Sequence, residues 1–156
     1  MRRKDREVTG RENLEAILAA CPIMRIGLVD EEGIYVVPVN YSYEYEGDDL
    51  VLYFHGAKSG RKAAALTKGN VVVGFEMDTN DGLDLDEEKY IYSIHYASII
   101  GTGVVNVVEG EQEKLEIMLR FMKQIAGRPI EFPAKVVAAC HVYKLTVREY
   151  SGKKRA

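Results

Sequence analysis

The spacing of apolar residues changes along the chain from a helical to a strand-like pattern. Leu14, Ile17 and Leu18 recur on one face at helical spacing. A capping box that starts at Thr9 predicts that this first helix begins there, and Cys21 marks its end. After Cys21 the apolar residues follow the shorter period of strands.

Runs rich in β-branched and aromatic residues then predict six strands, separated by turn residues and by two further helices. The run at 71–77 contains few polar residues, which indicates burial on both faces. The acidic segment 78–88 is expected to be a solvated loop rather than a calcium site, because Met77 and Thr79 would occupy two ligand positions. The strands are expected at residues 24–29, 34–45, 50–55, 71–77, 90–108 and 140–147, and the helices at 59–68 and 111–126.

These elements predict a mainly β fold with flanking helices. Strands in consecutive hairpins, with helices only at the start, in one crossover and near the end, are typical of an antiparallel β-barrel. They do not follow the strand–helix–strand order of a dinucleotide-binding fold. The chain has no internal repeat, low-complexity tract or linker, so a single domain over residues 1–156 is expected.

Composition and charge exclude several classes of protein. A hydrophobic content of 47% with 29% charged residues is typical of a globular chain and not of a disordered one. The net charge of -3 argues against a nucleic-acid partner, which would require a basic face. The chain shows no long apolar run and no apolar leader, which predicts a cytoplasmic protein without a membrane partner. The cysteines and histidines lack metal-ligand spacing, so no metal site is expected.

The segment that follows the third predicted strand carries the strongest candidate chemistry. Ser59 is the expected N-cap of the helix, which leaves the amides of Gly60, Arg61 and Lys62 as unpaired donors. Two cations beside the positive end of a helix cost about 0.3–1 kcal/mol each, which indicates that an anion sits in front of them. A phosphate fits, with Arg61 as a bidentate clamp and Lys62 as a point charge. The alternative is that both side chains extend into solvent.

Two further segments are compatible with either a ligand or an ordinary structural role. Pro38 lies inside a predicted strand and cannot donate to a β-ladder, which indicates an edge strand or a backbone that faces a ligand. A planar heteroaromatic ligand on this backbone would have Asn40 and Tyr41 as polar partners. Gly101 and Gly103 share one face of a later strand and leave room there for backbone or for a ligand.

Taken together, these segments resemble a known family. The chain resembles the flavin-binding split-barrel superfamily that includes pyridoxamine 5′-phosphate oxidase, and within it is most similar to the nitroimidazole-resistance (Nim-like) branch. Each match is short, but together they run in order over nearly the whole chain. The matching segments are residues 1–7, 35–41, 52–57, 59–62, 73–76, 96–103 and 151–154.

The resemblance implies a six-stranded antiparallel split β-barrel of the FMN-binding type, which forms a homodimer with FMN at the interface. The strand at 34–45 and the apolar run at 71–75 are suitable interface material. The resemblance further implies that Ser59, Arg61 and Lys62 hold the phosphate, and that the strand around Pro38 lies along the isoalloxazine ring. In such dimers the position of Ala97 and Ser98 contacts flavin, and the partner chain can supply this contact. The residues expected to bind the cofactor are Val37, Pro38, Val39, Asn40, Tyr41, His55, Ser59, Gly60, Arg61, Lys62, Ala97 and Ser98.

The function implied by the resemblance is that of an FMN-dependent oxidoreductase. It would reduce a small nitroaromatic or related planar substrate with electrons from a reduced nicotinamide, and His55, expected near the flavin, is the candidate catalytic residue. Three alternatives remain: a protein that holds flavin or haem without turnover, a pyridoxamine 5′-phosphate oxidase-like oxidase, and a ligand-free dimerisation module. Residues 148–156 differ from the arginine-containing motif with which pyridoxamine phosphate oxidases hold the substrate phosphate, and this counts against vitamin oxidation.

Overall fold

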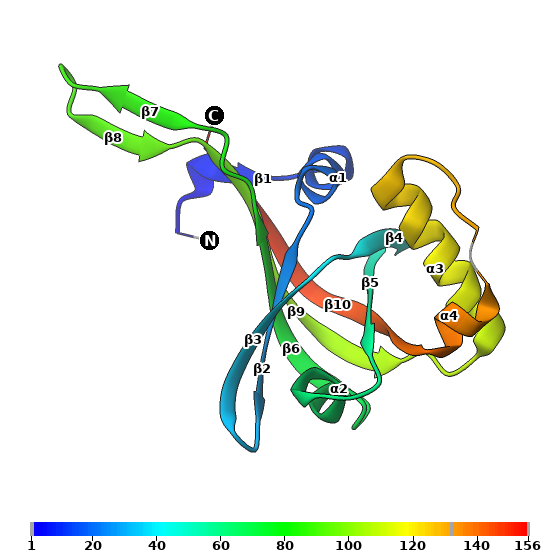
Figure 1. Cartoon of the computed structure of the whole chain (residues 1–156). Coiled ribbons are helices and arrows are strands. Elements are labelled where there is room, and N and C mark those ends of the chain that lie inside the picture. The colour runs from blue at the N-terminus through cyan, green and yellow to red at the C-terminus, as the bar shows by residue number, and fades with distance from the viewer. Residues whose placement is uncertain (1, 132, 156) are drawn as a thin grey trace.

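An antiparallel sheet runs through the molecule (Figure 1). The structure is a computed structural model that describes residues 2–131 and 133–155. Within these residues, eight strands form the sheet in the order β3-β2-β6-β9-β10-β5-β4, with β1 paired to β10, while β7 and β8 form a separate hairpin. The strands are β1 (Glu7–Val8), β2 (Met24–Asp30), β3 (Gly33–Val39), β4 (Ser42–Glu46), β5 (Asp49–Ala57), β6 (Val71–Asp78), β7 (Leu83–Asp86), β8 (Ile91–Ile94), β9 (Tyr96–Val107) and β10 (Cys140–Arg155). The helices are a short 3-10 turn (Lys4–Arg6), α1 (Arg11–Ala20), α2 (Arg61–Leu66), α3 (Glu111–Ala126) and α4 (Ala134–Ala138).

The long strand β10 connects the two halves of the sheet. Its first part, from Cys140 to Thr146, pairs with β5, and it pairs with β9 as far as Arg155. The register with β9 shifts between Val147 and Glu149, and such a bulge bends a strand. The sheet therefore curls around a core. Because β3 and β4, the two ends of the strand order, do not pair with each other, the barrel is open in the described part of the chain.

Two glycines of β9 permit a close approach of the neighbouring strand β10. A Cβ atom on Gly103 would lie 2.5 Å from the carbonyl oxygen of Thr146. One on Gly101 would lie 2.5 Å from both the carbonyl oxygen of Glu149 and the ring of Phe75. The room that the sequence indicated on this face is thus filled by backbone and a core ring, and not by a ligand.

The apolar core is divided between the two faces of β5. The main cluster fills the inside of the curled sheet and includes Leu50, Leu52 and Phe54 of β5, whose side chains alternate with those of the second cluster. The second cluster lies under α3 and α4 and consists of Val51, Tyr53, Val108, Ile117, Met118, Val137 and Val142. Helix α3 thus covers the outside of the barrel at β5 (Figure 1).

The mainly β architecture with antiparallel strands and flanking helices is confirmed. The helix at 111–126 is confirmed as α3, and Gly127 ends it in the left-handed conformation that favours glycine. The first helix begins at Arg11, with Gly10 as its N-cap, so the capping box that starts at Thr9 does not form.

The expected number of six strands is wrong, because the described residues form ten. The predicted strand at 34–45 is broken at Asn40 and Tyr41, where Tyr41 turns into the core. The acidic segment 78–88, expected to be a loop, contains strand β7, which pairs with β8 in a hairpin. Strand β6 is also not buried on both faces: Val73 points into the core, whereas Val72 is exposed.

Candidate functional site

The start of α2 differs from the turn that the sequence predicted. The helix begins at Arg61, and Gly60 is its N-cap with a φ of 94°. Glycine adopts this positive φ without the steric cost that other residues would have. Ser59 is exposed, and no side chain caps the helix, so the expected N-cap role of Ser59 is wrong. The helix also ends at Leu66.

Arg61 is held by an internal carboxylate. Its Nε and Nη2 atoms donate to the two carboxylate oxygens of Asp30 at 2.7 and 2.8 Å. Its guanidinium carbon lies 4.5 Å from the centre of the Tyr35 ring. The hydrogen bonds from Arg61 lower the pKa of Asp30 to about 2.

This ion pair changes the argument for a phosphate site. The two cations at the start of α2 indicated a neighbouring anion, and Asp30, at the end of β2, is such an anion. The local electrostatics alone therefore no longer require an external ligand. Asp30 occupies the Nε–Nη2 edge of Arg61, which leaves the Nη1–Nη2 edge, where exposed Glu32 lies 3.6 Å from Nη1.

The ammonium group of Lys62 is turned toward the sheet. Its Nζ atom donates to the main-chain carbonyl of His55 at 3.3 Å. A Cβ atom on Gly56 would lie 2.6 Å from both Nζ and Cε of Lys62, so glycine at this position leaves the space that the lysine occupies. Partial burial lowers the pKa of Lys62.

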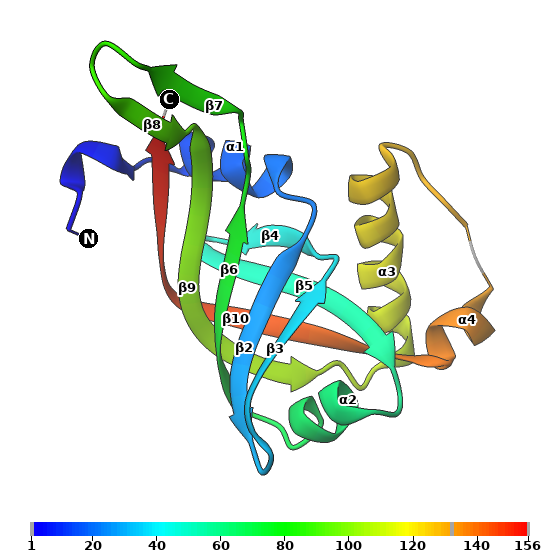
Figure 2. The ribbon, with the colours of Figure 1, turned by 60° about the vertical axis from the view of Figure 1, so that its left-hand side comes forward.

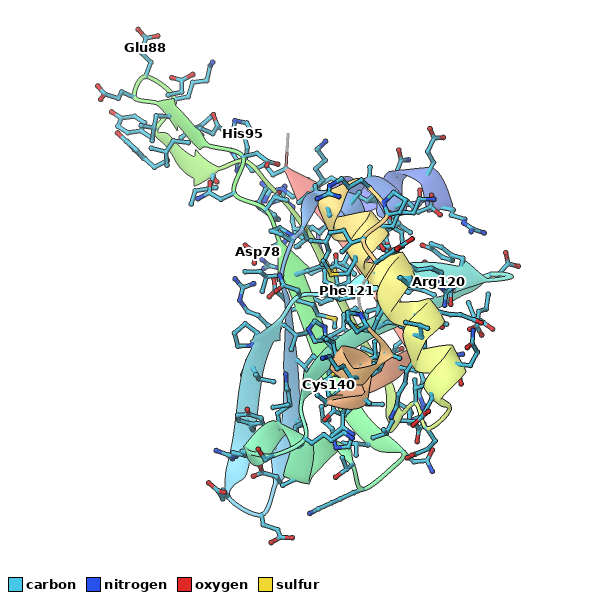
Figure 3. All side chains as sticks on the ribbon, turned by 45° about the vertical axis from the view of Figure 1, so that its right-hand side comes forward. Asp78, Glu88, His95, Arg120, Phe121 and Cys140 are labelled. Atoms are coloured by element: carbon cyan, nitrogen blue, oxygen red, sulfur yellow. The ribbon has the colours of Figure 1, made fainter. Side chains whose placement is uncertain are left out.

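His55 is a residue of β5, and its ring faces α3. Its ring meets the ring of Phe121 edge-on at a centroid distance of 5.0 Å, and Figure 3 labels Phe121 on α3. Among the described residues, Nδ1 of His55 is buried without a hydrogen-bond partner. Burial, and secondly the charge of Lys62, lower the pKa of His55, so its ring is neutral at pH 7.

Two other buried polar atoms on β10 have no partner in the described part of the chain. They are Nδ1 of His141 and the hydroxyl of Tyr143. His141 pairs with Gly56 and Tyr143 with Phe54, so both lie at the same end of the sheet as Lys62. The ring of Tyr143 stacks on Phe54 at 4.8 Å. No local pattern in the sequence predicts this group, because the register between β10 and β5 brings its members together.

Strand β3 is an edge strand, as Pro38 predicted. Among the described residues it pairs with β2 alone, so the missing amide of Pro38 breaks no second ladder. The side chain of Val39 is buried and that of Val37 packs against the core, whereas Pro38 is exposed. Val37, Pro38 and Val39 were expected to lie along the isoalloxazine ring. Of these three residues, Pro38 alone has an exposed side chain.

The two polar residues that follow β3 already have partners within the chain. The hydroxyl of buried Tyr41 donates to the carbonyl oxygen of Leu18 at 2.7 Å and lies 3.0 Å from the sulfur of Met77. Nδ2 of Asn40 donates to the carbonyl oxygen of Pro22 at 3.2 Å. These groups fix the break between β3 and β4, and the Tyr41 hydroxyl is not the free polar partner for a ligand that the sequence indicated.

Strands β2, β3, β6 and β9 lie side by side in the sheet (Figure 2). They carry exposed apolar side chains on the side away from the core, here called the outer sheet face. Ile34 is 82% exposed and Val29 75%. In the middle of the face Gly27 pairs with Gly74, and a Cβ atom on either would meet no atom nearer than 3.9 Å. Exposed apolar side chains gathered on one sheet face are typical of interaction sites. The ion pair of Arg25 with Glu76 lies on the same face, next to the glycine pair, and bounds the apolar part on that side. The face consists of Val29, Ile34, Val36, Val72 and Ile100 around this glycine pair.

Ala97 and Ser98 lie at the opposite end of this face from Arg61. Ser98 pairs with Asp78 at the end of β6, whereas α2 precedes the start of β6 at Val71. At about 3.3 Å per residue, the two ends are roughly 23 Å apart. Ala97 is buried and lines a cavity of about 420 Å³ next to α1.

One chain thus brings only part of the expected site together. Gly60, Arg61 and Lys62 gather where β5 meets α2, and Lys62 reaches the main-chain carbonyl of His55, whose ring packs instead on Phe121 of α3. Pro38, Ala97 and Ser98 lie toward the other end of the sheet. Asp30, which no sequence pattern indicated, is the closest charged partner of Arg61, and only the folded chain identifies it.

The described residues contain no group of three or more histidine, cysteine or acidic side chains placed to hold a metal ion. No helix among them is both long and apolar enough to span a membrane.

Comparison with known proteins is consistent with this fold. Residues 10–154 match the family model described as pyridoxamine 5′-phosphate oxidase. The comparison with curated proteins found no match.

Several solved structures have the same fold. A candidate 5-nitroimidazole antibiotic resistance protein from Bacteroides thetaiotaomicron is 26% identical with a TM-score of 0.79, over 95% of this chain and 86% of that one. The flavocytochrome Anf3 from Azotobacter vinelandii is 25% identical with a TM-score of 0.80, over 100% of this chain and 72% of that one. An FAD and haem binding protein from Mycobacterium smegmatis is 21% identical with a TM-score of 0.78, over 96% and 73%, and shows likeness of fold alone.

Proposed function

The chain belongs to the pyridoxamine 5′-phosphate oxidase family, and on this premise we propose that it is a flavin-dependent oxidoreductase. The proposed cofactor is FMN, held between two copies of the chain. The proposed substrate is a small nitroaromatic or related planar molecule, reduced with electrons from a reduced nicotinamide. Likeness to the candidate nitroimidazole resistance protein over most of both chains supports this substrate class.

The residues at the start of α2 fit the phosphate of such a cofactor. Lys62 and the Nη1–Nη2 edge of Arg61, which exposed Glu32 approaches to 3.6 Å, supply positive charge, and the first-turn amides of α2 have no partner inside the helix. The carboxylate of Asp30 fixes the guanidinium in place before a ligand arrives, which reduces the entropy lost on binding. In this proposal Asp30 is a positioning residue, and Arg61 binds the phosphate through its Nη1–Nη2 edge.

The exposed apolar side chains of the outer sheet face are the main support for the proposed homodimer. A second copy would bury its exposed apolar side chains, and the glycine pair at its centre permits close approach of another sheet. The same pairing accounts for the position of Ala97 and Ser98. They lie roughly 23 Å along the sheet from the α2 end, too far to be adjacent to Arg61 of their own chain. A two-fold related copy with reversed strands would bring them toward the α2 end of its partner.

A bound flavin would supply hydride and single-electron transfer. The protein's own part is to bind the phosphate, to exclude water from the ring and to provide a neutral imidazole at His55. Because the pKa of His55 is lowered by burial, the ring can accept or donate one hydrogen bond at neutral pH without a charge.

The first experiment is a visible absorption spectrum of the purified protein, with mass spectrometry of the compound released on denaturation. We expect flavin bands and release of FMN, and bleaching when a reduced nicotinamide is added without oxygen. Oxidation of the nicotinamide should then depend on an added nitroimidazole. A protein that takes up neither FMN nor FAD in a titration would contradict the proposal.

The second experiment assigns the phosphate site. Arg61→Ala with Lys62→Ala should weaken FMN binding at least about tenfold, because hydrogen bonds to charged groups contribute about 1.5–3 kcal/mol each. His55→Ala should have a smaller effect on FMN affinity. Lys68→Ala is the matched control, because it removes a charge just beyond the other end of α2. Equal losses in all three variants would contradict this division of roles.

Binding of flavin or haem without turnover is a second candidate, supported by the likeness to the flavocytochrome over the whole chain. A Soret band in the same spectrum, without oxidation of nicotinamide, would favour it. A pyridoxamine 5′-phosphate oxidase activity has less support, because β10 holds its C-terminal residues in a ladder and Arg155 pairs with Asp84.

A further inference from the structure

The hairpin of β7 and β8 projects from the body of the protein (Figures 1 and 2). It continues β6 and β9 beyond Asp78 and Tyr96, and its base is closed by main-chain hydrogen bonds between Asp81 and His95 and between His95 and Gly82. Figure 3 labels Glu88 near its tip and His95 near its base. An isolated two-stranded ribbon is at best marginally stable in water, which indicates that this hairpin packs against something.

One side of the hairpin is apolar and exposed. Leu83 pairs with Ile94 and Leu85 with Tyr92, so these four side chains lie together on one face. Leu83 is 69% exposed and Tyr92 65%. The opposite face is tied to the body through the ion pair between Asp84 and Arg155. The exposed face is therefore available to another molecule.

We infer that this hairpin is an arm that packs over the α2 end of a second copy of the chain, and this inference rests on the homodimer proposed above. The arm is continuous with the outer sheet face, because it extends β6 and β9 of that face. It also leans to the side of β2 and β3, away from α1 and α3 (Figure 1). When two outer sheet faces meet, the arm of each copy must extend over part of the other.

Charge decides which part of the second copy the arm meets. Residues 81–95 contain five acidic residues and one lysine, a net charge of -4 with histidine neutral. If strands of the two copies ran in the same direction, the two arms would lie side by side and repel each other. With the strands reversed, each arm meets the α2 end of its partner, so the reversed orientation is favoured.

The α2 end has the charge that the arm requires. Residues 58–68 contain four basic residues and no acidic one, a charge of +4, and the turn Asp30, Glu31 and Glu32 beside them reduces it to +1. Among the described residues, Lys58 takes part in no ion pair, and neither do Glu87 and Glu88 near the tip of the arm. These groups would face one another across the interface, with Leu85 and Tyr92 covering the surface beside α2.

The test is the dissociation constant of the dimer, measured by sedimentation equilibrium on the full chain. In the first variant, residues 82–94 are replaced by Asn-Gly, a two-residue hairpin turn, so that Asp81 and His95 still close the ladder. We expect the dissociation constant to rise at least about tenfold, as interface anchors commonly contribute that much or more. An unchanged constant would overturn the inference.

Charge reversal tests the orientation without removing the arm. Glu87→Lys with Glu88→Lys should weaken the dimer, and adding Lys58→Glu with Lys68→Glu to the same chain should restore it, because each contact occurs twice about the two-fold axis. The matched control is Glu111→Lys with Glu116→Lys, which makes the same charge change on the exposed side of α3. If reversing the arm charges strengthens the dimer, the arms lie beside each other and the inference is wrong.

The outcomes separate this inference from the proposed function. A dimer that binds flavin normally but is insensitive to the arm variants would overturn the inference alone. A wild-type chain that sediments as a monomer at all concentrations would overturn both the inference and the proposed homodimer. A dimer that depends on the arm but binds no flavin would support the inference and contradict the proposed cofactor.

Discussion

Replacing Gly103 by alanine tests how closely β10 approaches the neighbouring strand β9. The new methyl group would lie 2.5 Å from the carbonyl oxygen of Thr146, 2.7 Å from Cδ1 of Leu145 and 3.1 Å from Cα of Val147. Two of these atoms belong to the backbone of a strand paired on both sides, so they cannot move aside without disturbing the ladder.

The expected magnitude follows from these contacts. Overpacking of this kind costs about 1–3 kcal/mol. Because two of the contacting atoms are backbone, the cost lies in the upper part of this range, about 2–3 kcal/mol. Alanine regains about 0.5–1 kcal/mol over glycine within a strand. The net loss in the free energy of unfolding is therefore about 1–2.5 kcal/mol, which in a domain of this size lowers Tm by about 2–10 °C.

Gly56→Ala is the matched control. Its methyl group would also lie 2.6 Å from a neighbouring atom, but this neighbour is the flexible end of Lys62. Because the lysine can turn toward solvent, we expect stability within about 0.5 kcal/mol of the wild type. Both variants are measured by urea unfolding followed by far-ultraviolet circular dichroism, at one protein concentration so that dimerisation affects them equally. Equal stability of the two variants would refute the close approach of β10 to Gly103.

Three further predictions concern buried or paired groups. Tyr143→Phe should raise the free energy of unfolding by about 1 kcal/mol in thermal unfolding, because the hydroxyl is buried and has no hydrogen-bond partner in residues 2–131 and 133–155. A loss of stability would show that it has a partner. Since the hydrogen bonds from Arg61 lower the pKa of Asp30 to about 2, its stabilising effect is present above pH 4 and lost as the pH falls toward 2. Asp30→Asn should therefore flatten the pH dependence of stability in that range, and an unchanged profile would contradict the pairing. Burial raises the pKa of Cys21 to about 11. Iodoacetamide at pH 8 should therefore modify half-buried Cys140 well before Cys21 in the native protein, as read by peptide mass spectrometry. Equal rates of modification would refute the burial of Cys21.

The local pattern of the sequence was enough to predict much of the fold. The period of apolar residues placed α3 at Glu111–Ala126, and Pro38 marked β3 as an edge strand. These features depend on the chemistry of neighbouring residues, which the sequence contains. The segment at 78–88 shows where local reasoning was insufficient: its charges suggested a solvated loop, but the pairing of β7 with β8 makes it half of a hairpin.

The candidate site was predicted less completely. The sequence identified Gly60, Arg61 and Lys62 as a group, and the structure keeps them at the start of α2. It missed Asp30, because this carboxylate is 31 residues away along the chain and comes close only when the turn after β2 packs beside α2. It also assigned Tyr41 to a ligand, whereas the hydroxyl is used by the carbonyl oxygen of Leu18.

By itself, the sequence determined where the long helices and the central strands form, which face of each of these helices is apolar and which segments carry positive charge. Only the tertiary structure decided which carboxylate neutralises Arg61, which polar atoms remain unpaired and which apolar side chains stay exposed. The physical reason is that helical and strand periods are set by residues a few positions apart, whereas an ion pair or an exposed face depends on the register and approach of distant strands.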